Sequence, residues 1–216
     1  MPEQTILKTS DSSGVATITL NRPNVFNGYN KEFLIKLREV VTELESDRAV
    51  RVIMLRGAGK HFSAGADINW FKELAEASMD TQLEAARLST GAMRALDKCT
   101  KPTIALIHNA CFGGGTGYAA ACDIVIASED ARFAITEVRV GITPAPILIQ
   151  LVKAIGVRQM RRYALTAETF DVVQAKSIGL VHEICPVGGL DKAAESVIDA
   201  LLRGGPIAIR DTKNLI

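Results

Sequence analysis

Residues 103–127 read TIALIHNACFGGGTGYAAACDIVIA, and this stretch decides the fold class. Its first part, Thr103–Ile107, is an almost wholly apolar run that predicts a strand buried on both faces. A glycine triplet follows at Gly113–Gly115, then residues 116–122 predict a buried helix and residues 124–127 the next strand. Alternation of buried strands and helices with short connections indicates an α/β or related layered fold with crossover connections.

The same alternation extends toward the N-terminus. Val15–Leu20 alternates apolar and polar residues, as a half-buried strand does, and Val52–Leu55 is another short apolar run. Between them, Asn30 can cap a helix whose apolar stripe lies within residues 33–44. A further helix is expected over about Thr81–Leu96.

After Pro146 the pattern becomes mostly helical. The helices expected there are Ile147–Ile155, Val157–Leu165, Phe170–Ile178 and Lys192–Leu202, with the start of another at Ile207–Ile216. We therefore expect a mixed core over residues 1–145 and a helical region over residues 146–216.

Composition excludes several classes of protein. The 216 residues include 25 basic and 24 acidic side chains, a net charge of +1 that argues against a nucleic-acid-binding protein and leaves only a local basic patch for RNA. The apolar runs are far shorter than the roughly 20 residues needed to span a bilayer. The first residues lack the features of a secretory signal. We expect a cytoplasmic protein without membrane attachment.

The cysteines and histidines are scattered. Cys99, Cys111, Cys122 and Cys185 form no C-x-x-C pair, and no histidine lies near them at zinc-ligand spacing. We interpret the cysteines as small core residues in a reducing compartment and expect no metal site.

Two glycine-bearing loops each follow a buried strand: His61–Ile68, HFSAGADI, and Ala110–Gly117, ACFGGGTG. Glycine lets the backbone approach a ligand closely, and N–H groups at a helix start carry partial positive charge. Two such loops facing each other could direct two N–H groups at one oxygen, which is an oxyanion hole. Taken singly, each loop reads as a tight turn. GGGTG lacks both the register of the dinucleotide fingerprint and the Walker lysine, which disfavours a nucleotide-phosphate site.

Several segments along the chain fit one family pattern. They are Asn21–Asn27, Val52–Gly57, Phe62–Ile68, Lys101–Thr103 through Gly113–Gly115, Ala121–Ile124, Ala131–Phe133 through Glu137, and Ala175–Val181. On these segments nearly the whole chain resembles the crotonase (enoyl-CoA hydratase/isomerase) superfamily. The resemblance implies a spiral of repeated ββα units with a helical C-terminal region, and a homotrimer or hexamer.

The resemblance also implies an acyl-CoA thioester as the substrate. The N–H groups of Ala66 and Gly114 would form the oxyanion hole, and Glu137 would be the general acid/base. The substrate-binding positions it implies are Val25, Ala64, Gly65, Asp67, Ile68, Trp70, Gly113, Gly117 and Ala145. Trp70 has two readings, as a cover of the acyl pocket or as an anchor in the core.

The chain departs from the family pattern at three places. Hydratases of the family carry a second glutamate where this chain has Gly117. Ala145 and Pro146 replace a glycine-rich stretch, and with the neighbouring motifs they resemble bacterial hydratases for methylglutaconyl-CoA and isohexenylglutaconyl-CoA. Relatives usually continue some tens of residues further, so we expect the helical region to be incomplete.

These observations predict an enoyl-CoA hydratase. It would add water across the 2,3 double bond of a branched or carboxylated 2-enoyl-CoA such as 3-methylglutaconyl-CoA, with Glu137 moving the protons. One glutamate also suits an enoyl-CoA isomerase or a thioester hydrolase, and a non-catalytic acyl-CoA-binding subunit is the alternative from another class. No metal or redox cofactor is expected, because CoA is part of the substrate.

Overall fold

The computed structural model describes residues 4–216. The strands are β1 (Ile6–Ser10), β2 (Val15–Leu20), β3 (Val52–Gly57), β4 (Thr103–Ile107), β5 (Ala110–Phe112), β6 (Ile124–Ser128), β7 (Arg132–Ala134), β8 (Phe170–Asp171) and β9 (Glu183–Cys185). The α-helices are α1 (Lys31–Ser46), α2 (Ile68–Ala75), α3 (Met79–Asp97), α4 (Gly114–Ala121), α5 (Leu148–Thr166), α6 (Val172–Ser177), α7 (Leu190–Arg203) and α8 (Pro206–Leu215). Short 3-10 turns are η1 (Pro23–Val25), η2 (Glu137–Val140) and η3 (Ala145–Ile147).

The main sheet has the strand order β1-β2-β3-β4-β6-β9. β1 pairs antiparallel with β2, and every later pair in this sheet is parallel. A smaller sheet has the order β5-β7-β8, with β5 and β7 parallel and β8 antiparallel to β7. The α/β class and the crossover connections expected from the sequence are therefore confirmed.

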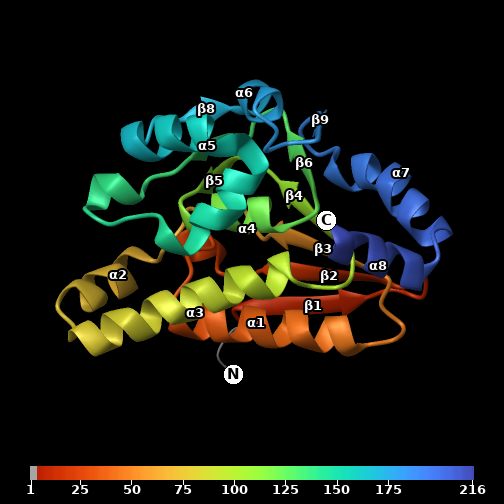
Figure 1. The fold of residues 1–216 in the computed structure, drawn as a ribbon, viewed down its shortest axis with the longest axis horizontal. Helices are drawn as coiled ribbons and strands as arrows, with labels where there is room; N and C mark the ends of the chain where they lie inside the picture. The colour runs from red at the N-terminus through yellow and green to blue at the C-terminus, as the bar shows by residue number, and fades with distance from the viewer. Residues whose placement is uncertain (1–3) are drawn as a thin grey trace.

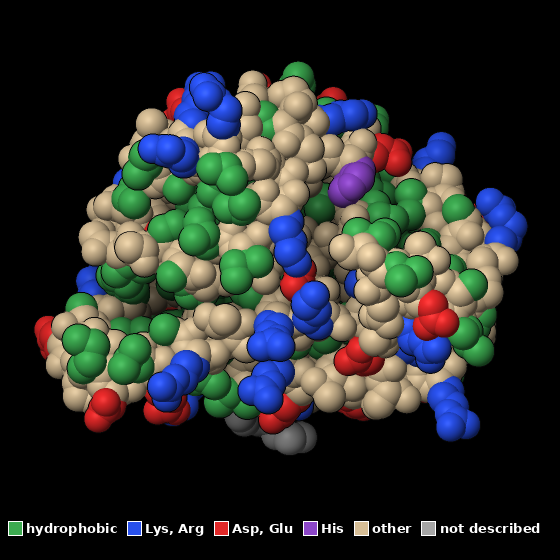
Figure 2. Space-filling view, viewed as in Figure 1, with side chains coloured by type: hydrophobic (Ala, Val, Ile, Leu, Met, Phe, Trp, Pro, Cys, Tyr) green, Lys and Arg blue, Asp and Glu red, His purple; other side chains and the backbone are tan. Residues whose placement is uncertain are grey.

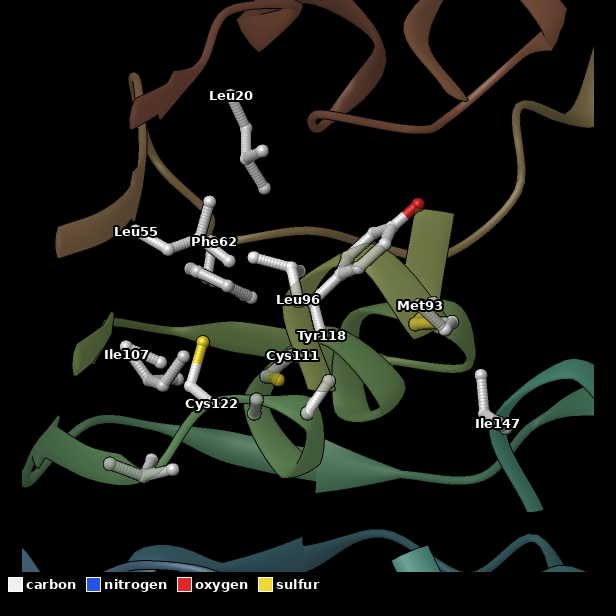
Figure 3. Packing of buried hydrophobic residues seen from close by; sticks show 14 of the residues in the cluster. Leu20, Leu55, Phe62, Met93, Leu96, Ile107, Cys111, Tyr118, Cys122 and Ile147 are labelled. Carbon is white, nitrogen blue, oxygen red and sulfur yellow. The ribbon is translucent and has the colours of Figure 1, made fainter. Parts of the chain in front are cut away.

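Side chains alternate between the two faces of the main sheet, as the pleat requires. Ile53 and Leu55 of β3 join the larger core with α1, α3 and α4, whereas Val52 of β3 joins a smaller core under α7. Figure 1 shows α1 and α3 side by side below the sheet and α7 on the far side of it. Figure 3 shows part of the larger core, in which Leu20, Leu55 and Phe62 approach Leu96 of α3 and Tyr118 of α4.

Local signals explain the helix boundaries. The Asn30 side chain accepts a hydrogen bond of 3.0 Å from the Phe33 N–H, which is the cap expected for α1. α5 contains a break at Gly156, whose φ of 72° is left-handed, so the two expected helices meet there. Residues 170–178 were expected to be one helix, but their first two residues form β8 because they pair with β7.

The expected division into a mixed core over residues 1–145 and a helical region over residues 146–216 stays a prediction. β8 and β9 follow it in the chain, yet they pair with β7 and β6, which precede it. The larger core likewise contains residues from both sides, such as Ile18 and Leu151.

The four cysteines are free and buried, as the sequence indicates. Burial raises the pKa of the Cys122 thiol to about 12, which keeps it protonated and unreactive at neutral pH. Within residues 4–216, no helix is both long enough and apolar enough to cross a membrane. Figure 2 shows basic and acidic side chains intermixed on one face of the molecule.

Candidate active site

The first glycine-bearing loop connects β3 to α2 and leaves one N–H free. Along residues 62–67 the N–H groups donate in turn to His108 O, Ala110 O, Phe26 O, Ser63 Oγ and, from Asp67, to Tyr29 O. The exception is Ala66, whose N–H donates to no acceptor within residues 4–216. The loop is thus fixed mainly by two segments that are distant in sequence, residues 26–29 and 108–110, and the one donor it leaves available is the predicted one.

The second loop leads from β5 into α4. Gly113 has a φ of 49° and a ψ of −124°, and its N–H donates to Ala134 O at 2.8 Å. Gly114 is the first residue of α4, so its N–H has no partner inside the helix. The N-terminal end of a helix favours negative charge, and here that end is presented by glycines without side chains.

The two loops meet at the predicted pair of donors. Gly65, beside Ala66, has a φ of 96°, and a Cβ atom there would lie 3.2 Å from Phe112 O and 3.7 Å from the Gly114 nitrogen. Ser63 also pairs with Cys111 across the loops. The structure therefore brings the backbone next to Ala66 against Gly114, although the two residues are far apart in sequence.

The Glu137 carboxylate lies beside the same helix end. A Cβ atom on Gly113 would be 3.2 Å from Glu137 Oε1 and 3.1 Å from Thr136 Oγ1. The other carboxylate oxygen, Oε2, is buried and has no hydrogen-bond partner within residues 4–216. Burial raises the pKa of Glu137 above its ordinary value, and nearby N–H groups of Glu137 and Thr136 oppose this only in part. A carboxylate with a raised pKa and one buried, unpartnered oxygen is suited to accepting and returning a proton.

Gly117 faces apolar side chains. A Cβ atom there would lie 2.2 Å from Ile147 Cγ2 and 3.1 Å from Met93 Cε, so the space is filled from η3 and α3. Figure 3 shows Met93 and Ile147 near the helix that carries Tyr118. The space beside Gly117 is therefore filled by protein, and its role in substrate binding stays a prediction.

The Asp67 side chain is occupied by protein partners. Its carboxylate pairs with Arg22 at 2.8 Å and accepts the Asn69 N–H at 2.9 Å, which caps α2. The pair is largely buried, with the Arg22 and Asp67 side chains 18% and 8% exposed. Its side chain and N–H thus fix the loop that carries Ala66, and substrate binding at Asp67 stays a prediction.

The remaining predicted residues surround these loops. Val25 in η1, Ile68 at the start of α2 and Ala145 in η3 are exposed, and Ala64 is partly exposed. Trp70 packs on the larger core, and its ring lies edge-on to Tyr29 with centroids 6.0 Å apart. Trp70 is thus partly buried against the core, and its contact with the acyl chain stays a prediction. Tyr29 lies between its ring and Gly114.

The sequence did not point to Tyr29, Thr136 or Ile147 as neighbours of the site. Tyr29 Cε1 lies only 2.4 Å from the position a Gly114 Cβ would take. The only sequence signal for Tyr29 is an aromatic residue two places after the Asn21–Asn27 segment. Its place beside the site becomes apparent only when the fold brings that segment to α4.

Known proteins share this architecture. The family model described as enoyl-CoA hydratase/isomerase matches residues 10–216. The chain is 34% identical to a short-chain-enoyl-CoA hydratase of Clostridium acetobutylicum, covering 94% of this chain and 77% of that protein. It is also 34% identical to a peroxisomal Δ(3,5)-Δ(2,4)-dienoyl-CoA isomerase of Arabidopsis thaliana, covering 98% and 80%. A crystal structure of an enoyl-CoA hydratase from Shewanella pealeana superposes with a TM-score of 0.94 at 36% identity, covering 98% and 78%.

Proposed function

The chain belongs to the enoyl-CoA hydratase/isomerase family, the crotonase superfamily, and on that premise we propose that it hydrates a 2-enoyl-CoA. One observation carries the proposal. The buried, unpartnered oxygen of Glu137 lies beside the helix end that presents the Gly114 N–H, with the free Ala66 N–H in the adjoining loop. This arrangement joins a proton carrier to two donors for a developing negative charge.

The proposed reaction uses these groups in sequence. The thioester oxygen accepts hydrogen bonds from the Ala66 and Gly114 N–H groups, which polarises the conjugated double bond. Glu137 takes a proton from water as the water oxygen bonds to C3, and the negative charge moves to the thioester oxygen. Glu137 then returns the proton to C2, so that one molecule of water is added and the carboxylate is regenerated.

A branched or carboxylated acyl chain, such as that of 3-methylglutaconyl-CoA, is the substrate we propose. Support comes from the sequence segments around Gly113–Gly117 and Gly141–Ile147, which depart from the common hydratase pattern. Ile147 fills the space beside Gly117, so the pocket differs there from one that contains a glutamate.

Isomerisation of the double bond is the second candidate, and one observation favours it. With Gly117 packed against Ile147, α4 contributes no carboxylate, and Glu137 stands without a second glutamate from that helix. Moving a proton from one carbon to another requires a single carrier.

A substrate panel separates the candidates. The protein is incubated with 3-methylglutaconyl-CoA, 3-methylcrotonyl-CoA, crotonyl-CoA and a 3-enoyl-CoA, and products are separated by mass. A gain of one water supports hydration, a shifted double bond at constant mass supports isomerisation, and free CoA indicates hydrolysis. Binding without conversion of any thioester would contradict an enzymatic role.

Glu137→Gln tests the carrier directly. The amide keeps the size of the side chain but cannot accept the proton, so kcat should fall about 10²–10⁴-fold while a saturated acyl-CoA still binds. Glu195→Gln, at an exposed position on α7, is the matched control and should keep full activity. Wild-type turnover by Glu137→Gln would refute the proposed role.

Assembly as a homotrimer or hexamer is also proposed from the family resemblance. Exposed apolar side chains such as Val157, Leu165 and Ile207 lie on the helices that follow residue 146. Light scattering on the purified protein should give a multiple of three chains, and a stable monomer would contradict this.

A further inference from the structure

Tyr29 places a hydroxyl group at the proposed site from a rigid part of the backbone. Its N–H donates to Gly65 O at 2.9 Å and its carbonyl accepts the Asp67 N–H at 2.9 Å, so it is bridged to both sides of Ala66. The ring is held edge-on between Trp70 and Tyr118, with centroid distances of 6.0 Å and 6.1 Å. Tyr29 is therefore fixed by the same hydrogen bonds that leave the Ala66 N–H free.

The Tyr29 side chain is partly exposed, and its hydroxyl has no hydrogen-bond partner within residues 4–216. The aromatic rings of Phe33, Trp70 and Tyr118 lie beside its own ring. The Tyr29 hydroxyl lies 3.2 Å from the position that a Cβ atom on Gly114 would take. Glu137 Oε1 lies the same distance from the Cβ position of the preceding residue, Gly113. Two consecutive glycines at the start of α4 thus have a phenol hydroxyl beside one and a carboxylate beside the other.

The hydroxyl keeps its proton in this environment. Burial, and secondly the negative charge of Glu137, raise the pKa of Tyr29 well above its ordinary value. The group is therefore a neutral hydrogen-bond donor at neutral pH, and it is not a base.

The glycines on one face of α4 leave room for the Tyr29 hydroxyl, which comes from a different segment of the chain. Gly114 and Gly117 are three residues apart, so they lie on one face of the helix. A longer side chain at position 117 would point back toward the N-terminal turn, where the Tyr29 hydroxyl now lies. Ile147 fills the space beside Gly117. One turn earlier in the helix, the Tyr29 hydroxyl lies beside Gly114.

We propose that the Tyr29 hydroxyl donates a hydrogen bond to the water molecule that Glu137 deprotonates, and so orients that water toward C3. This inference rests on the proposed hydration. In the step, the water O–H bond breaks, its proton passes to Glu137, and the oxygen bonds to C3. The Tyr29 proton stays on Tyr29, so no further reactant is needed. Tyr29 is a positioning residue. Its hydroxyl orients the attacking water, which is one of the tasks that a second carboxylate would perform.

Tyr29→Phe removes the hydroxyl and keeps the ring. We expect kcat for hydration of the best enoyl-CoA in the panel to fall about 10–100-fold, by comparison with the loss of other single hydrogen-bond donors in active sites. KM and the Kd for the corresponding saturated acyl-CoA should change less than about twofold, because the saturated thioester needs no attacking water. A structural defect would instead raise Kd and lower the melting temperature.

Tyr118→Phe is the matched control. Tyr118 is fully buried, contacts the Tyr29 ring, and has a hydroxyl without a hydrogen-bond partner within residues 4–216. Figure 3 shows its ring beside Leu96 and Met93, with the hydroxyl pointing away from them. Its loss should leave kcat unchanged, and an equal loss in both variants would overturn the proposed role of Tyr29.

Glu137→Gln, measured in the same series, separates the two proposals. If Glu137→Gln is inactive and Tyr29→Phe retains full hydration, the inference about Tyr29 is wrong and the proposed function stands. If Glu137→Gln hydrates as well as wild type, the proposed function itself fails. A Tyr29→Phe variant that loses saturated acyl-CoA binding in parallel with kcat would also overturn the water-orienting role.

Discussion

Ala66 and Gly114 lie on loops that meet, and each has a free N–H group, but for different physical reasons. Gly114 is the first residue of a helix, and any residue there would lack an intrahelical acceptor. Ala66 lies in an irregular loop, where its N–H is free because each neighbour from residue 62 to 67 donates elsewhere. The first donor is a property of the secondary structure, whereas the second depends on contacts with residues 26–29 and 108–110. Substitutions at residues that hold the loop should therefore disturb the Ala66 N–H, whereas comparable substitutions near α4 should leave the Gly114 N–H in place.

The largest expected effect comes from removing the helix donor itself. Gly114→Pro lacks the N–H, and proline is otherwise acceptable at the first position of a helix. Gly114→Ala is the control, because both substitutions place a carbon against the Tyr29 ring but only proline loses the donor. We expect kcat of the proline variant to lie about 10²–10³-fold below that of the alanine variant. Equal kcat in the two variants would show that this N–H does not stabilise the transition state.

The loop donor should be sensitive to the Asp67 side chain, whose partners are Arg22 and the first turn of α2. Asp67→Asn keeps an oxygen to cap α2 but removes the charge opposite Arg22, leaving a largely buried guanidinium unpaired. We expect a loss of about 2–3 kcal/mol in the free energy of unfolding, roughly 5–10 °C in Tm, and a lower kcat/KM.

Thr116→Val is the corresponding change at the helix. It removes only the 2.6 Å hydrogen bond from Thr116 Oγ1 to Gly113 O. Its cost should be about 1 kcal/mol, with kcat/KM nearly unchanged. Thermal unfolding followed by circular dichroism measures the stability of Asp67→Asn and Thr116→Val. A larger loss of unfolding free energy in Thr116→Val than in Asp67→Asn would contradict the proposed difference between the two donors.

Gly117 tests how tightly the helix side is packed. Gly117→Ala would place a methyl group against Ile147, and we expect it to destabilise the protein by about 1–3 kcal/mol. In the double variant with Ile147→Ala the two effects should be less than additive, because alanine lacks the Cγ2 methyl that the new side chain would meet. Strict additivity in chemical denaturation would contradict the contact.

The smallest effect concerns pH. The raised pKa of Glu137 means that the folded protein binds this proton more tightly than the unfolded chain, whose ordinary value is 4.5. Its contribution to stability is fully present below that value and is lost as pH rises through the folded pKa. Glu137→Gln should therefore be more stable than wild type at neutral pH, and the difference should vanish toward pH 4.

Activity should show the opposite trend. The ionised carboxylate is the base, so kcat/KM should rise with pH, with a midpoint above 4.5. A pH profile with its acid limb at or below the ordinary glutamate value would contradict the buried setting of Glu137.

Long, strongly patterned segments could be predicted from the sequence. Thr103–Ile107, Val15–Leu20 and the Asn30 cap appear in the structure as expected, because each has a local signal in composition or spacing. β5, β7 and β9 are three residues each and went unrecognised, since pairing with neighbours is what makes them strands.

The site divides in the same way. Ala66, Gly114 and Glu137 followed from a resemblance of motifs, and the fold brings the two loops and Glu137 together. Tyr29 against Gly114, and Ile147 against Gly117, are contacts between residues more than 25 positions apart. Only the arrangement of chain segments in space reveals them, and the Arg22 partner of Asp67 was missed for the same reason.

The strand order of the main sheet has a consequence for protein synthesis. From β1 to β6 every strand of this sheet joins the edge formed by the strand before it, so a chain leaving the ribosome can extend the sheet in the order in which it is made. The longest interval between successive strands of this sheet separates β6, which ends at Ser128, from β9, which begins at Glu183. During that interval the β6 edge has no partner in its own sheet, and an unpaired edge is where a nascent chain is most open to pairing with another chain. The ribosome-bound stage at which β9 is still inside the exit tunnel is thus the stage of greatest exposure to aggregation.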